Sequence, residues 1–313
     1  ILFEPRRWRD RSLSTQLIPW QGERVVLLTT RPNFNTRVMG RFLRRLDSGW
    51  KLYADLVGKS PALFKSLNGK PTITAVPSAD LTCGYGCGFV GLSGIEAAGF
   101  YDSDYPLVVR QPNAFPHYYF YEMGRNYYLF GERHSLFVTG FAVFMRYVCM
   151  DTLRCEDPDS STRATIERCE SVYARSEIPF IRAFTNLRDQ GEKADRLSEP
   201  NGNPIIPSDQ PVMYATAMLT LRKDLGGNAW LRRYFAMLAR CPEVVPDNET
   251  LALRQCLNWL VSASIAARRD LTPVFVDRWR MPLSRGARET LRRISWTRPN
   301  LDPAVILARL PVE

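Results

Sequence analysis

Histidine is the scarcest chemically active residue in this chain of 313 amino acids, and it occurs only as His117 and His134. Catalytic triads and many metal sites depend on histidine, so one of these two residues would have to serve any such site. Neither has a persuasive Ser or Asp partner. The sequence also has no Gly-x-Ser-x-Gly elbow and no Gly-x-x-x-x-Gly-Lys loop, and no Gly-x-Gly-x-x-Gly stretch opens a helical segment. These absences weigh against serine hydrolases of the elbow type, P-loop enzymes and dinucleotide-binding enzymes.

Long hydrophobic runs are missing as well. No stretch of about 18 or more uncharged apolar residues occurs, so no membrane-spanning helix is expected. The composition, 45% hydrophobic and 24% charged, is that of a globular protein. It excludes a disordered chain, a collagen-like repeat and a small disulfide-stapled scaffold. At about 150 residues per domain, the length predicts two domains, or one domain in two lobes, with a core large enough to fold unaided.

Lysine is scarce, whereas arginine is abundant. Only six of the 42 basic residues are lysines, and the 32 acidic residues leave a net charge of +10. Such a charge is compatible with a solvated basic surface, or with attraction to an anionic polysaccharide, a cell-envelope polymer or a nucleic acid. Because the arginines are spread along the chain and form no basic run, we do not expect a nucleic-acid partner.

The seven cysteines lie mostly in near pairs. The spacing suggests the pairs Cys83–Cys87, Cys149–Cys155 and Cys241–Cys256. Three disulfides, with Cys169 left over, would suit an exported protein, secreted or periplasmic in a bacterium. The first pair has no second pair at zinc-ligand spacing, so a cysteine zinc site is not expected. The chain begins at Ile1 without a methionine or a signal sequence, and we expect a mature or trimmed chain.

The front of the chain is rich in predicted strands. Residues 1–21 contain many Arg and Trp residues without a clear period, which predicts an irregular N-terminal arm. Apolar residues at helical spacing predict a long amphipathic helix over 36–56. Short apolar and β-branched runs predict strands at 24–30, 70–76 and 105–110, and a Gly-broken stretch predicts a strand or hairpin within 87–95.

The back of the chain is helical. Two buried helices are expected over 117–130 and 136–150, and a polar loop over 188–207. Further helices are expected over 162–173, 179–187, 211–225, 230–240, 249–267 and after residue 282. This order predicts an α+β protein with an α+β lobe at 22–150 and a helical lobe at 151–313.

The two buried helices carry a candidate site. In zinc peptidases, His-Glu-x-x-His places two histidines on one helix face to bind the metal, and the glutamate polarises a water. Within the segment FYEMGRN, Tyr121 and Arg125 stand at the two histidine positions and Glu122 stands at the glutamate position. The next helix, VTGFAVFMRY, resembles the Glu-Gly-x-Ala-x-x-x-Arg segment of the plant basic secretory proteins and related gluzincin peptidases. Thr139 then stands at the third-ligand position.

This resemblance implies a gluzincin-like metallopeptidase fold, in which a small twisted sheet covers a motif helix and a cleft separates it from a helical lobe. Gluzincins place a strand, a long helix, three strands and the motif helix in the order expected here for 24–150. Their later helix, whose Tyr can assist at the site, is similar to 211–225. Thr139 and Tyr214 are the cleft residues that the resemblance implies, and Asn126 and His134 are further candidate cleft residues. The segments CGYGCGFVG, FYEMGRNYYLF and LTPVFVDRWRMPL also resemble a bacterial family to which we attach no activity.

The residues at the three ligand positions of the motif decide whether a zinc ion is expected there. Arginine has a permanent charge and no acceptor lone pair, so Arg125 would repel a zinc ion, and Thr139 and neutral Tyr121 are weak ligands. We therefore expect no zinc in the standard place and no cofactor. Glu122, His117 and His134 are the residues that could still bind a metal, so a rearranged metal site built from them is the remaining metal hypothesis. His117 lies four residues before Tyr121, on the same helix face.

Without a metal, two interpretations remain open. Glu122 and Arg125, three residues apart, can form a buried salt bridge; the protein is then a metallopeptidase-like pseudoenzyme that uses the cleft for binding or structure. Alternatively, Glu122, Tyr121, Arg125 and His117 cleave a glycan, with Arg125 neutralising an anionic group and Tyr121 or Glu122 moving a proton. The nearby tyrosines fit either a sugar-binding cleft or a core: Tyr118, Tyr119, Tyr127 and Tyr128.

Overall fold

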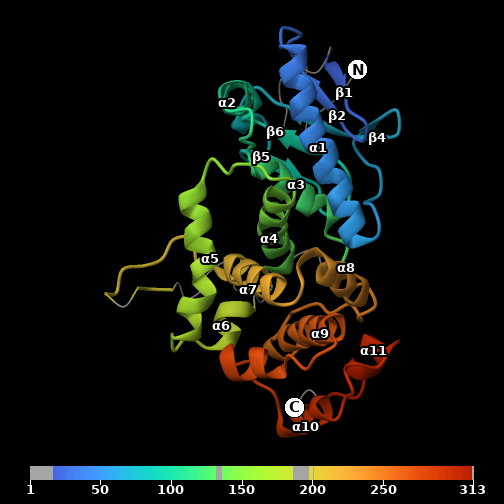
Figure 1. The fold of residues 1–313 in the computed structure, drawn as a ribbon, viewed down its shortest axis with the longest axis vertical. Helices are drawn as coiled ribbons and strands as arrows, with labels where there is room; N and C mark the ends of the chain where they lie inside the picture. The colour runs from blue at the N-terminus through green and yellow to red at the C-terminus, as the bar shows by residue number, and fades with distance from the viewer. Residues whose placement is uncertain (1–16, 132–135, 186–196, 200, 312–313) are drawn as a thin grey trace. The chain divides into compact units, whose positions relative to one another are not determined.

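The computed structural model describes residues 17–131, 136–185, 197–199 and 201–311 (Figure 1). Their contacts divide the chain into two units. The first contains the described chain up to Asp55, Lys59–Tyr128 and Met145–Ser160; the second contains Leu56–Gly58, Leu129–Phe144 and the described chain from Ser161 onward. The predicted lobe boundaries at 21 and 150 stay predictions.

A mixed six-stranded sheet forms the centre of the first unit. Its strands are β1 (Ile18–Gln21), β2 (Val26–Thr29), β3 (Ser66–Leu67), β4 (Lys70–Ala75), β5 (Gly86–Gly88) and β6 (Ile95–Ala97). They lie in the order β1-β2-β4-β6-β5, and β3 pairs with β4 off this path. The β2, β4 and β6 strands are parallel, whereas β1, β3 and β5 run antiparallel to their neighbours. Strand β5 is therefore an edge of the sheet.

Helix α1 (Thr36–Val57) is the long amphipathic helix that the apolar spacing predicts. The side-chain oxygen of Asn35 accepts hydrogen bonds from the backbone N–H groups of Arg37 and Val38 and so caps the start of the helix. Asp47, a buried residue of the same helix, accepts the backbone N–H groups of residues 23–25 at 2.7 to 3.0 Å. The helix thereby fixes the turn between β1 and β2.

The strand predicted at 105–110 is wrong. This segment is helix α2 (Tyr105–Arg110), and it continues from the π-helical turn η3 (Phe100–Asp104). Pro106 lies in the first turn, where a proline ring fits a helix. The Tyr105 hydroxyl accepts the backbone N–H of Asn35 at 2.8 Å. Turn chemistry and this tertiary contact outweigh the β propensity of the valines that follow.

The irregular arm predicted for 1–21 is also wrong at its described end. Residues 18–21 form β1, which pairs antiparallel with β2. The indole N–H of Trp20 donates to the Thr29 hydroxyl at 2.9 Å across this pair. Four residues are too short a run to show the alternation of a strand in the sequence.

The other strands and helices predicted between residues 22 and 152 are confirmed. Strands β2 and β4 match 24–30 and 70–76, and β5 with β6 forms the hairpin expected near 87–95. Helices α3 (Tyr118–Tyr127) and α4 (Leu136–Thr152) are the two buried helices. The division between the units falls within α4, at residues 144 and 145.

The second unit is helical. Its further helices are α5 (Ser160–Ala174, whose first residue belongs to the first unit), α6 (Phe180–Phe184), α7 (Gln210–Asp224), α8 (Gly227–Leu238), α9 (Glu249–Ala267), η4 (Pro273–Arg278), α10 (Arg285–Arg292) and α11 (Pro303–Leu307). Aromatic rings fill its core: Trp259 stacks on Trp279 at 5.4 Å and packs edge-on against Phe275 at 4.9 Å. The predicted α+β class is confirmed. In the described part of the chain, no helix is both long and apolar enough to cross a membrane.

Candidate functional site

Helix α3 presents one partly exposed stripe and otherwise buried residues. The stripe consists of Tyr118, Tyr121 and Arg125, three and four residues apart, together with His117 just before the helix. Phe120 and Met123 are fully buried. The predicted candidates Tyr121 and Arg125 therefore lie where solvent reaches the helix, and a catalytic role for them stays a prediction.

Glu122 is buried beneath the edge strand β5, with 6% of its surface exposed. Its carboxylate accepts the backbone N–H of Gly88 at 2.7 Å. A Cβ added at Gly88 would lie 2.5 Å from the Glu122 carbonyl oxygen, and one added at Gly86 would lie 2.7 Å from a Glu122 carboxylate oxygen. Only a strand with glycine at both positions can lie this close to the helix.

The environment of Glu122 favours its neutral form. Burial raises the pKa of this carboxyl to about 7, although the Gly88 N–H and the charge of Arg125 both act to lower it. Near neutral pH the side chain is therefore divided between protonated and ionised forms. A carboxyl group with this pKa can be either a structural group or a general acid.

Asn126, a predicted cleft residue, is fully buried. Its amide nitrogen donates to the carbonyl oxygens of Phe89 and Gly94, both at 3.0 Å. These two carbonyls lie in the connection between β5 and β6. Asn126 therefore holds the β5–β6 hairpin on helix α3, a structural role that the sequence did not indicate.

His117 lies against an acidic partner. Its Nδ1 is 3.0 Å from a carboxylate oxygen of Asp157, and 15% of the His117 side chain and 5% of the Asp157 side chain are exposed. Burial alone would raise the pKa of Asp157, but hydrogen bonds from His117 and from the backbone N–H of Asp159 outweigh it and lower the pKa. This pair orients His117 beside α3. His134, the other predicted histidine, lies outside the described residues.

Thr139 and Tyr214, also predicted as cleft residues, belong to the second unit. Thr139 is partly exposed on α4. Tyr214 is instead 2% exposed and packs against Trp259 at 4.9 Å. A Cβ added at Gly140 would lie 2.6 Å from the Tyr214 ring, so α4 and α7 approach closely at this point. The structure thus places Tyr214 in the aromatic core of its unit.

The tyrosines of α3 include a cluster that sequence reasoning missed. Tyr119 and Tyr127 are fully buried and Tyr128 is 5% exposed, so these three belong to the core. Tyr118 and Tyr119 both donate their hydroxyls to the buried carboxylate of Asp104, at 2.5 and 2.9 Å. Burial raises the pKa of Asp104, and these hydrogen bonds partly offset the rise. No spacing in the sequence links Asp104 to α3, because the contact depends on the η3 turn.

One of the three predicted disulfides is present. Cys83 and Cys87 are bonded. The Cys149–Cys155 prediction is wrong, because both side chains are buried thiols and Arg45 donates to the Cys155 sulfur.

The Cys241–Cys256 prediction is wrong as well. Cys241 lies against Asn258 and Ser262 of α9, whereas Cys256 points from another face of that helix toward the carbonyl of Phe184. The pairs were predicted from their short separation in the sequence, which does not show the direction in which each side chain points.

Among the described residues, no group of three or more His, Cys, Asp or Glu side chains is arranged to hold a metal ion. Glu122 and His117 belong to no such group, and the rearranged metal site that also includes His134 stays a hypothesis, because His134 lies outside the described residues.

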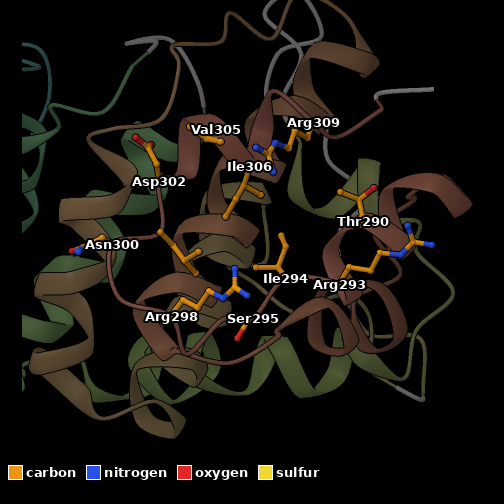
Figure 2. A pocket seen from close by; sticks show the side chains of 11 residues that line it. Thr290, Arg293, Ile294, Ser295, Arg298, Asn300, Asp302, Val305, Ile306 and Arg309 are labelled. Carbon is orange, nitrogen blue, oxygen red and sulfur yellow. The ribbon is translucent and has the colours of Figure 1, made fainter.

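Two hollows are lined by arginines. The hollow in the first unit has a volume of about 320 Å³, and its charged side chains are Arg41, Arg44 and Arg45. The hollow in the second unit has a volume of about 530 Å³ and contains Arg293, Arg298 and Arg309. In Figure 2, Ile294 and Ile306 lie between Arg298 and Arg309. Asp302 is the one acidic side chain among the lining residues, and it pairs with Arg240 at 3.0 Å.

Comparison with known proteins gives little support for an identity. No family model matches the chain, and no curated protein matches it. One similar solved structure is that of yeast LTA4 hydrolase in complex with Bestatin, with 15% identity and a TM-score of 0.47. The match covers 86% of this chain and 40% of that one, so the chain spans well under half of that protein. A likeness of this strength carries no conclusion about activity, and the gluzincin resemblance continues to rest on the sequence motifs.

Proposed function

We propose that this chain is an exported binding protein for an anionic polysaccharide or cell-envelope polymer, built on a metallopeptidase-like frame without the standard zinc site. The observation that carries the proposal is the charge of the hollow in the second unit, which has three arginines and a single acid that is already paired. The net charge of +10 favours the same class of partner. The Cys83–Cys87 disulfide supports export.

The position of Glu122 supports a binding role over peptide hydrolysis. A catalytic glutamate must reach a water and a scissile bond, whereas β5 covers this carboxylate and the Gly88 N–H occupies one of its oxygens. Arg125, at a position where zinc peptidases have a ligand, adds a positive charge beside it. Glu122 thus serves to attach β5 to α3.

The proposal predicts salt-sensitive binding of the whole chain to polygalacturonate and no binding to neutral dextran. Replacing Arg298 and Arg309 together by Gln is expected to weaken binding about tenfold, because these guanidinium groups attract the carboxylates of the polymer. The matched control is Arg254→Gln with Arg285→Gln, which removes the same charge outside the hollow. Affinity is measured by surface plasmon resonance at two salt concentrations. Equal binding of dextran, or equal loss in the two double variants, would contradict the proposal.

A second function is favoured by one observation. The pKa of about 7 for Glu122 is suited to a general acid working near neutral pH. In that case Glu122, with Tyr121 and Arg125, cleaves an acidic glycan, and β5 must move away from α3 during the reaction. The two proposals differ in the role of Glu122: the cleaving enzyme needs its proton for turnover, whereas the binding protein does not need it.

A further inference from the structure

The hollow of the first unit is formed by one face of α1. Arg41, Arg44, Arg45 and Ser48 follow one another at i, i+3, i+4 and i+7, the spacing of neighbours on a helix surface. The opposite wall is apolar and comes from Val108, Pro112, Ala114, Phe115 and Leu153. Three guanidinium groups therefore border a small hollow that has one apolar side.

The charges of these arginines are not compensated. No acidic side chain lines the hollow, and among the described residues no carboxylate pairs with any of the three arginines. Arg45 donates to the sulfur of Cys155. Burial raises the pKa of that thiol, although Arg45 acts to lower it. Within the described chain, no carboxylate therefore neutralises these three positive charges.

One of the lining side chains has a buried donor without an acceptor among the described residues. The Nε of Arg41 is buried and has no hydrogen-bond partner, while its Nη2 donates to the Val108 carbonyl at 3.3 Å. A buried unsatisfied donor is unusual in a folded protein and calls for an explanation. Arg44 is exposed, and its Nη1 lies 3.4 Å from where a Cβ at Gly40 would stand. Arg44 is thus free to adjust, whereas Arg41 is fixed.

We propose that this hollow binds the phosphate group of a small phosphate monoester. Planar guanidinium groups form paired hydrogen bonds with phosphate oxygens, and a dianion offsets three positive charges better than a single carboxylate does. The volume of about 320 Å³ lies at the lower end of the range of small-molecule sites, ~300–1,000 Å³, so an organic group can accompany the phosphate. This inference goes beyond polymer binding, because the site takes an isolated small anion in the first unit.

Calorimetric titration of the whole chain tests the proposal, with inorganic phosphate, glucose 6-phosphate, sulfate and acetate as probes. Phosphate and glucose 6-phosphate are expected to bind saturably, and acetate at least about tenfold more weakly. Arg44→Gln, an exposed position that should leave the fold intact, is expected to weaken phosphate binding about tenfold, and Arg44→Lys less. Arg285→Gln, which removes the same charge elsewhere, is expected to change nothing. Sulfate binding as tight as phosphate binding would overturn the preference for a phosphate monoester.

A second readout reports on the site itself. The ¹⁵N Nε–H resonance of Arg41 is expected to shift on addition of phosphate and to stay in place with acetate. Absence of saturable phosphate binding, equal affinity in wild type and Arg44→Gln, or acetate binding as tight as phosphate would overturn the proposal. The Arg298→Gln, Arg309→Gln variant should bind phosphate normally, which separates failure of this site from failure of polymer binding.

Discussion

Glu122→Gln is expected to raise the free energy of unfolding by about 3 kcal/mol at pH 8 and to change it little at pH 4.5. The folded pKa of about 7 lies above the ordinary value of 4.5, so the folded state holds the extra proton between these two values. Stability therefore falls as pH rises through this window, and above pH 7 the chain carries the full cost of a buried charge. Glutamine has no proton to lose and retains an oxygen that can accept the Gly88 N–H.

Urea unfolding of wild type and variant at the two pH values measures this effect. The control is Glu23→Gln in the same unit, since the Glu23 side chain is 78% exposed and its replacement removes the same charge. The control should show no pH-dependent gain. A Glu122→Gln variant that is less stable than wild type at pH 8 would mean that the ionised carboxylate stabilises the fold, contrary to the burial seen here.

Gly88→Ala is expected to destabilise the first unit by about 3 kcal/mol. The new methyl group would lie 2.5 Å from the Glu122 carbonyl oxygen and 2.9 Å from its carboxylate. The carbonyl belongs to the helix backbone and cannot rotate away, so β5 would have to separate from α3. Thermal and urea unfolding measure the loss.

Gly40→Ala is the matched comparison. Gly40 lies in α1, and the nearest atom to its added Cβ is the mobile end of Arg44 at 3.4 Å. Alanine is a better helix former than glycine, so this variant should be neutral or more stable by up to about 1 kcal/mol. If Gly88→Ala were equally harmless, β5 would not be the tight cover over Glu122 that the geometry indicates.

The regular parts of the fold could be predicted because they repeat a simple period. The 3.6-residue spacing of apolar residues located α1 and α9 almost to the residue, and the buried runs located α3 and α4. The segment 105–110 failed because two adjacent valines suggest a strand, while the preceding η3 turn and Pro106 start a helix. Local composition could not show which of these would prevail.

The site was predictable only in part. The motif frame singled out Glu122, but its burial depends on Gly86 and Gly88, which lie more than thirty residues earlier and reach α3 through the sheet. The disulfide predictions failed for a similar reason, since sequence spacing does not say which helix face a cysteine occupies. The arginine face of α1 did leave a signal: three arginines and a serine recur at helical spacing within eight residues.

The most direct measurement compares wild type with Glu122→Gln in an activity screen on peptides and on acidic and neutral polysaccharides. Each substrate is followed both for product formation and for binding. The binding proposal predicts no product with either protein, and equal affinity of both for an acidic polysaccharide. Product formed by the wild type and abolished in the variant, with the fold intact, would contradict it and make Glu122 a catalytic acid.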